Sequence, residues 1–318
     1  MKKKMVNSER IEGRIYQHDL VVKQVQNADS KNFGKDFISG TLEVAVDDEG
    51  LNVIPVHYTY VTGVTSAGKT NATFTTLLKI INENKTWMTV GKENATMVRC
   101  EPSLSLNEFY NNEDNLISVK TNEGGFIRII PTLSEKISDR SFFKVDMLIN
   151  RVSEIEPDEE KGRKGGVAVG GAVFDFKGSL LPVEFSVCEA GQKYFLDLDA
   201  SPNNPVFTQV WGRINCSSET VTRTEESAFG EAAVSSYEKK TKEWLITGAR
   251  TESYEFGDED TITVDDVKKA MQDRETHLAT VKKNQEEWKA KKSADGASNA
   301  ASPAAVAAKI PNNGEFKF

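Results

Sequence analysis

Two segments of the chain, 37–60 and 168–187, carry the same β-hairpin pattern, and this repetition limits the possible folds more than any other feature. In the first segment, apolar and β-branched residues recur at mostly even spacing on both sides of the acidic turn 47–50. Such alternation around an Asp- and Gly-containing turn is typical of paired antiparallel strands. The second segment repeats the order at Gly40 and Gly171, Pro55 and Pro182, Val56 and Val183, and Tyr58 and Phe185. The chain is therefore predicted to use one β-unit twice.

The segments around the first hairpin complete the first unit. A long strand or a bent pair of strands is predicted over 11–26, followed by the polar loop 27–35. After the hairpin, apolar residues at helical spacing predict a helix over 71–82 with Asn71 as its N-cap. Further strands are predicted over 86–90, 95–106, 117–120 and 126–130. Three strands, a helix and then more strands are the layout of a five-stranded OB-type barrel.

The second unit begins with a long strand near Ser141, and a charged, Gly-rich loop precedes its hairpin. No clear helix is predicted after this hairpin, and strands are predicted over 192–199, 206–215 and 243–250. The polar residues 217–242 predict a long, mobile loop. A sparse apolar stripe then predicts a helix over 265–292, and the Ala- and Ser-rich residues that follow predict a flexible tether.

The predicted fold class is mainly β, with two tandem OB-type five-stranded barrels followed by a C-terminal helix and a disordered tail. Its predicted parts are a first domain over 1–135, a second domain over 136–255, an acidic segment and helix over 256–292, and a tether with an apolar tip over 293–318.

Composition excludes several classes of function. A net charge of −8 argues against a uniformly basic coat for nucleic acid, although a local basic groove remains compatible with it. The three cysteines, Cys100, Cys188 and Cys216, are irregularly spaced and predict neither a zinc site nor a disulfide framework. No signal peptide or membrane span is predicted, so a cytoplasmic protein without membrane contact is expected. The scattered histidines predict no metal, no cofactor and no catalytic pair.

The run Gly63-Val64-Thr65-Ser66-Ala67-Gly68-Lys69-Thr70 fits the phosphate-loop pattern GxxxxGK[ST], and it stands between a predicted strand and a predicted helix. In such a loop Lys69 would contact nucleotide phosphates and Thr70 a Mg²⁺ ion. Against this, a phosphate loop belongs to a fold of alternating strands and helices, and the second unit carries no equivalent motif. The preferred interpretation is a turn bent at Gly63 and Gly68 whose Lys69 touches a phosphate backbone. A P-loop nucleotide-binding ATPase is the alternative.

Proteins bind single-stranded nucleic acid with a positively charged groove and aromatic rings on which bases stack. In an OB barrel this groove crosses the second and third strands between two loops. Candidate DNA-binding residues of the first unit are Lys31, Phe33, Lys35, His57, Tyr58, Tyr60, Lys69, Trp87, Arg99, Phe109, Tyr110 and Lys120. Those of the second unit are Arg163, Lys164, Phe174, Trp211 and Arg213. The alternative to DNA binding is structural: each aromatic side chain would lie in the core, and each cation would be a solvated surface charge.

The run 97–120, MVRCEPSLSLNEFYNNEDNLISVK, resembles the end of the OB fold in single-stranded DNA-binding proteins of tailed bacteriophages. The hairpin 37–60 and the turn 68–74 are similar to the centre of that fold. The resemblance covers about residues 10–250 and is weaker in the second unit. It implies a non-catalytic protein that coats single-stranded DNA in replication and recombination, with tandem OB folds as in replication protein A. A phage-encoded protein would act in the cytoplasm of its host cell.

The C-terminal tip has two interpretations, a sequence end without function or a short docking peptide. Phe316 and Phe318 are then the candidate partner-binding residues, and the resemblance implies replication or recombination proteins as the partners. The tip departs from the acidic tip of bacterial single-stranded DNA-binding proteins, because Glu315 is its only acid. A structural or assembly protein of a virion is a further alternative for the whole chain. The oligomeric state is left open.

Overall fold

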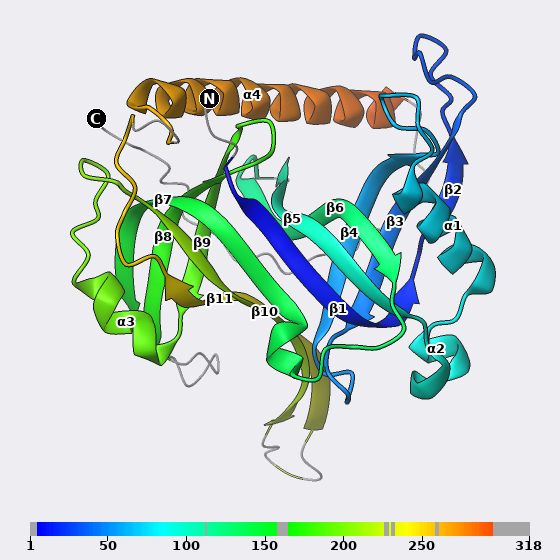
Figure 1. The fold of residues 1–318 in the computed structure, drawn as a ribbon, viewed down its shortest axis with the longest axis horizontal. Coiled ribbons are helices and arrows are strands. Elements are labelled where there is room, and N and C mark those ends of the chain that lie inside the picture. Colours follow the sequence, from blue (N-terminus) through cyan, green and yellow to red (C-terminus); the bar gives the residue numbers. More distant parts are fainter. Residues whose placement is uncertain are drawn as a thin grey trace.

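The computed structural model describes residues 5–111, 113–157, 165–225, 229, 233–257 and 261–294. Within this part of the chain, eleven strands join into one continuous sheet. A long helix, α4 (Val264–Ala294), runs along one edge of the molecule (Figure 1). The mainly β fold class and the C-terminal helix are therefore confirmed. The predicted tail lies outside the described residues from position 295 onward.

The first half of the sheet closes into a ring, which we call the first ring. Its members are β1 (Asn7–His18), β3 (Asp36–Ala45), β4 (Val53–Thr62), β5 (Met97–Tyr110) and β6 (Leu116–Ile129). The order β1-β5-β6-β4-β3 closes because β3 pairs back with β1. All its pairings are antiparallel except that of β4 with β6. The predicted hairpin 37–60 supplies two neighbouring strands of this ring.

A second ring follows with the same order of pairing. Its members are β7 (Ser141–Ile155), β8 (Gly166–Phe174), β9 (Leu180–Val187), β10 (Val206–Glu225) and β11 (Ala233–Ala249). Here β10 pairs back with β7, and β9 runs parallel to β11 as β4 does to β6. The two echoing hairpins thus occupy equivalent places, as the repeated sequence pattern predicts.

The rings share a seam between β1 and β7, which pair from Asn7 opposite Val145 to Ile11 opposite Ser141. Because of this seam the sheet continues from one ring into the other. One cluster of buried apolar residues also includes members of both rings, among them Leu42 and Phe185. The predicted domain boundaries near 135 and 255 stay predictions.

Helix α1 (Ala72–Glu83) follows β4 and begins at the predicted cap, where Asn71 Oδ1 accepts the N–H of Thr73 at 3.1 Å. The predicted strand 86–90 is wrong, because Thr86 and Thr89 form a reciprocal capping box at the start of α2 (Trp87–Val90). The predicted strand 192–199 is also wrong. Helix α3 (Glu189–Leu196) occupies its first part and buries Phe195. Each ring therefore has a helix after its third strand. Short 3-10 turns lie at Lys92–Asn94 and Ile137–Asp139.

The strands β10 and β11 extend well beyond the second ring as a two-stranded arm (Figure 1). The long loop predicted over 217–242 is wrong, because the pairing continues to Glu225 opposite Ala233. The β-branched residues Thr220, Thr222 and Thr224 alternate along the segment and favour a strand even though the segment is polar. At its base the arm touches the first ring, where the N–H of Cys216 donates to Asn52 Oδ1 at 2.8 Å.

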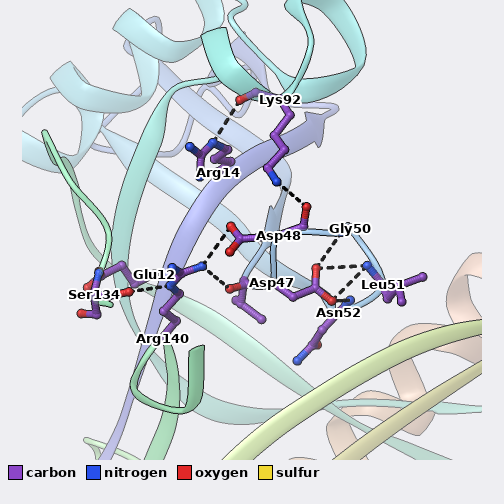
Figure 2. A network of polar contacts seen from close by, with 11 residues as sticks. Glu12, Arg14, Asp47, Asp48, Gly50, Leu51, Asn52, Lys92, Ser134 and Arg140 are labelled. Carbon is purple, nitrogen blue, oxygen red and sulfur yellow. Dashed lines mark hydrogen bonds and ion pairs between the residues drawn. The ribbon is translucent and has the colours of Figure 1, made fainter. Parts of the chain in front are cut away.

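The turn between β3 and β4 is fixed by the polar network in Figure 2. The Asp47 carboxylate accepts the backbone N–H groups of Gly50, Leu51 and Asn52. The Arg140 guanidinium, from the end of the linker between the rings, donates to the Val46 carbonyl at 3.2 Å and lies 3.4 Å from an Asp48 carboxylate oxygen. The turn, the linker and the arm are therefore held together beside the seam.

A second apolar cluster lies beneath the C-terminal segment. Its buried members from the sheet include Leu148, Phe174 and Phe207, and those from α4 include Val267 and Ala270. The first half of α4 is therefore packed on the second ring. The other half reaches the tip of the β5–β6 hairpin, where Gln285 Oε1 accepts the N–H of Tyr110 at 2.8 Å. Helix α4 bridges the two rings.

Candidate nucleic-acid interface

The start of β3 and the end of β4 lie side by side at one corner of the first ring. Strand β2 (Val21–Gln24) pairs with β3 so that Lys23 lies opposite Phe37, and Phe37 in turn lies opposite Thr62. Backbone hydrogen bonds of Val25 with residues 34 and 35 close the hairpin between β2 and β3. This corner therefore joins the loop between the first two ring strands to the loop that follows β4. We call its side chains the corner surface: Lys23, Lys31, Phe33, Lys35, Phe37, Tyr60 and Lys69.

The corner surface presents aromatic rings to solvent. Phe33 is 56% exposed and Tyr60 is 48% exposed. The Tyr60 ring leans on Phe37, with 4.7 Å between the ring centroids, and its hydroxyl accepts a hydrogen bond from Asn32 Nδ2 at 3.3 Å. These contacts hold Tyr60 in place while leaving part of its ring free. An exposed and positioned ring can stack on an unpaired base.

Positive charge surrounds these rings. Lys23, Lys31, Lys35 and Lys69 are all exposed. The acids in the segments 20–37 and 63–70 are Asp29 and Asp36, so lysines outnumber acids by four to two. Lys35 donates to Asn32 Oδ1 at 3.2 Å, which fixes its side chain on the same loop that supports Tyr60. The local field therefore favours an anion despite the negative charge of the whole chain.

The phosphate-loop motif at 63–70 folds as a small hairpin. Val64 and Thr70 form an isolated β-bridge. The N–H groups of Thr65, Gly68 and Lys69 all donate to oxygens of the loop itself. A phosphate loop needs such N–H groups to converge on its ligand. Here they are already used, so the geometry supports a turn that presents Lys69 at the corner and gives no support to a nucleotide cradle.

Two aromatic side chains that were predicted to bind DNA lie in the core, so they are not available to a ligand. Tyr58 is 1% exposed and Phe174 is 0% exposed. Tyr58 faces the interior of the first ring, whereas Phe174 lies in the second apolar cluster under α4. Strand alternation predicts that neighbouring side chains face opposite ways, but it does not reveal which face is buried. The exposed ring on β4 is Tyr60.

Two predicted cations have partners inside the protein. Lys120 donates to the carbonyl of Glu184, and its ammonium lies 5.0 Å from the Trp244 ring centroid, so burial lowers the pKa of Lys120 to about 8. Arg99 pairs with the buried Glu12 at 2.7 Å. Burial alone would raise the pKa of Glu12, but hydrogen bonds from the Ser134 N–H and Arg99 hold it below its usual value. In this structure each of the two cations binds a residue of another strand.

His57 lies on the outer face of β4, half-buried, with Nδ1 3.1 Å from Thr41 Oγ1. Burial and the nearby Lys242 lower the pKa of His57. The imidazole therefore favours its neutral form at neutral pH, and its contribution to an anion site would come from hydrogen bonding rather than charge.

Three further aromatic candidates lie away from the corner surface. Trp87 packs beside Tyr16, with 5.9 Å between their ring centroids, near the β3–β4 turn. Phe109 is 37% exposed at the β5–β6 tip. Tyr110 is at the same tip under α4, with the Lys282 ammonium 5.7 Å from its ring centroid. The structure therefore does not bring these rings together with Phe33 and Tyr60.

The second-unit candidates divide into two groups. Trp211 is half-buried and Arg213 is exposed, both on β10 of the second ring. Arg163 and Lys164 lie outside the described residues, as do the partner-binding candidates Phe316 and Phe318 of the C-terminal tip. Sequence reasoning did not select Lys23 and Phe37 as site residues. Their place follows from the β2–β3 register, which no local pattern in the sequence specifies.

In the described part of the chain no cluster of His, Cys, Asp and Glu has the composition of a metal site. The three cysteines are free, and burial raises the pKa of the Cys100 thiol to about 12. Among the same residues, no helix combines the length and the apolar run needed to cross a membrane.

Comparison with known proteins gives one family. No curated protein matches the chain in sequence. A crystal structure of a deletion mutant of the single-stranded DNA binding protein from Thermus aquaticus is similar over 81% of this chain and 99% of that one, with 10% identity and a TM-score of 0.46. A replication protein A heterotrimer bound to single-stranded DNA is similar over 75% of this chain and 49% of that one, with 10% identity and a TM-score of 0.19. Both scores are low, and neither likeness establishes a function. The sequence model of the YorF family matches residues 7–285, and the chain therefore belongs to the YorF family.

Proposed function

We propose that this protein binds single-stranded DNA without catalysis and with little sequence preference, and that the corner surface makes the principal contact. The observation that carries the proposal is the position of two exposed aromatic side chains, Phe33 and Tyr60. They lie among four exposed lysines at one corner of the first ring. The loop between the first two strands of an OB-type barrel is one of the loops that bind nucleic acid in such folds.

The chemistry of the corner surface favours single strands over duplex. Bases that are free to leave the stack can lie on Phe33 and Tyr60, and each such contact is worth roughly 1–3 kcal/mol. The lysine ammonium groups can neutralise phosphates in any sequence. Because neither kind of contact uses base edges, the proposed binding tolerates many sequences.

A wider role accompanies this proposal. The protein would coat and protect single-stranded DNA during replication or recombination in the cytoplasm, which is the host cytoplasm if a phage encodes it. The resemblance of residues 97–120 to phage proteins supports this role. Replication or recombination proteins are the proposed partners of the C-terminal tip.

The test is a titration of labelled oligo-dT, followed by fluorescence anisotropy at several salt concentrations. The strand should have about 30 nucleotides, more than the roughly 4–16 that one OB unit covers. The F33A/Y60A variant should bind at least about tenfold more weakly, since one stacking contact of about 1.4 kcal/mol corresponds to a factor of ten. The K31A/K35A variant should reduce the slope of log affinity against log salt by about 1.4.

The matched control removes two exposed aromatic side chains that lie outside the corner surface. Phe126 and Phe176 are 72% and 75% exposed and lie outside the corner surface. The F126A/F176A variant should bind as the unmodified protein does. If F33A/Y60A and K31A/K35A both retain full affinity and full salt dependence, the corner surface is not the binding site. If the unmodified protein binds no single-stranded DNA at low salt, the proposed function itself fails.

A further inference from the structure

Trp211 and Arg213 belong to a second surface that the corner surface does not include. Strands β10, β7 and β1 are adjacent where the rings join (Figure 1). Trp211 lies opposite Lys144, and Lys144 lies opposite Ser8. Two residues along the strands, Arg10 of β1 lies opposite Phe142 of β7. Arg213 is the residue of β10 after Gly212, and Gly212 lies opposite Phe143.

These side chains point away from the core. The alternate residues Val210, Val145 and Ile11 on the same three strands are fully buried in the shared apolar cluster. Successive side chains of a strand face opposite sides of the sheet, so Trp211, Lys144 and Arg10 lie on the outer side. We call the outer side chains Arg10, Phe142, Lys144, Trp211 and Arg213 the junction face.

Within the described part of the chain, the cations of the junction face have no ion-pair partner. No described acidic side chain forms an ion pair with Arg10, Lys144 or Arg213. Arg10 Nη2 donates to the Asp139 carbonyl at 2.7 Å, while its buried Nε has no hydrogen-bond partner among the described residues. Adjacent strands lie about 5 Å apart, so the three cations spread over roughly 10 Å of surface.

The indole of Trp211 is held in a fixed place beside these cations. Gly248 of β11 lies directly opposite Trp211 of β10. A Cβ atom at position 248 would come within 2.4 Å of Trp211 Nε1, so the indole needs glycine there. The half-buried indole therefore lies over the backbone of β11 at Gly248.

We propose that the junction face is a second contact for the backbone of single-stranded DNA. Lys144 and Arg213 bind phosphates, and Trp211 provides a stacking ring. Cations that form no ion pair with a described acid favour a polyanion, and the fixed aromatic side chain favours nucleic acid over an acidic peptide. This inference rests on the proposed function but uses strands other than the β2–β4 corner, so the two surfaces can be tested separately.

The experiment uses the full chain and oligo-dT of about 60 nucleotides, long enough to cover more than one OB unit. The K144A/R213A variant should lower the salt slope by about 1.4, corresponding to two lost phosphate contacts. Saturating DNA should quench tryptophan fluorescence, and the W211F variant should lose that part of the quenching. The control K79A/K193A removes two exposed lysines from outside both surfaces and should leave the slope unchanged.

Each result decides between the surfaces. If K144A/R213A keeps the full salt slope, or if W211F loses none of the quenching, the junction face is not a DNA contact. If the corner variants bind normally while K144A/R213A weakens binding, the junction face stands and the corner surface is wrong. Denaturant unfolding of K144A/R213A and W211F is the folding control. Midpoints equal to that of the unmodified protein would show that a loss of DNA binding is not caused by unfolding.

Discussion

Glu9 places a carboxyl group in the core beside the seam of the two rings. Its side chain is 3% exposed, Oε1 accepts from Trp244 Nε1 at 3.0 Å, and Oε2 has no partner among the described residues. Burial raises the pKa of Glu9 to about 8, although Trp244 and Lys242 act in the opposite direction. The neutral acid is therefore the form that the fold favours at neutral pH.

This acid should make stability depend on pH. Between its ordinary pKa of 4.5 and about 8, the unfolded chain releases a proton that folded Glu9 retains. Its contribution to the free energy of unfolding therefore falls as pH rises through that range and is constant above it. Glu9→Gln should remove this fall, so E9Q should gain stability relative to the unmodified protein from about pH 5 to about pH 8. Urea unfolding of both proteins at several pH values measures the difference between their free energies of unfolding. A difference that does not change with pH would contradict the raised pKa of Glu9.

At the same scale, the sequence predicts residue types better than their orientation. The basic and aromatic character of residues 31–35 is plain in the sequence, and the structure leaves Lys31, Phe33 and Lys35 exposed. Tyr58 and Tyr60 have the same local pattern, yet one ring is buried and the other exposed. The pairing of β3 with β4 shifts register between Ile38 and Gly40, and the extra residue lies on β4 between Tyr58 and Val61. Alternation alone cannot predict such a bulge.

At the scale of elements, helix α4 depends on a buried ion pair. Arg274 donates to Glu108 Oε2 at 3.1 Å and to the Leu180 carbonyl at 3.3 Å. The side chains of Arg274 and Glu108 are only 10% and 4% exposed. This pair therefore ties α4 to β5 of the first ring and to β9 of the second.

Removing one partner should cost far more than removing both. Arg274→Ala leaves Glu108 buried without its cation, and we expect a loss of about 3–5 kcal/mol in the free energy of unfolding. The double variant E108L/R274M should recover much of that loss, because it leaves no unpaired charge. Lys283→Ala is the control: its pair with Glu287 is exposed, so about 0–1 kcal/mol is expected. Denaturant titration tests the series, and equal losses for R274A and K283A would show that the buried pair is not important.

Elements with a periodic apolar pattern, strong or sparse, can be predicted from the sequence, whereas elements that depend on tertiary contacts cannot. The hairpins, α1 with its Asn71 cap and α4 follow from alternation and helical spacing. The sequence YFLDLD at 194–199 looks like a strand, but burial of Phe195 against the second ring favours helix α3. The polar composition of the arm predicts a loop, whereas the pairing of β10 with β11 makes it two strands.

At the scale of the whole molecule, two rings of like topology are joined edge to edge and bridged by one helix (Figure 1). The repeated hairpin predicts the two rings, but the β1–β7 seam has no signal in the sequence. The seam also creates the junction face, because it makes the strands of Arg10 and Lys144 neighbours. The corner surface lies on the first ring alone. The molecule therefore has two separate surfaces that combine cations with aromatic side chains.

Photo-crosslinking of single-stranded DNA that carries a halogenated deoxyuridine, followed by mass spectrometry of the peptides, tests the central claim most directly. Binding at the corner surface predicts crosslinks to Phe33 or Tyr60, which are lost in F33A/Y60A. Crosslinks to Trp211 in addition would agree with the junction face. Crosslinks confined to peptides that contain neither surface, such as those carrying Phe126 or Phe176, would contradict the account.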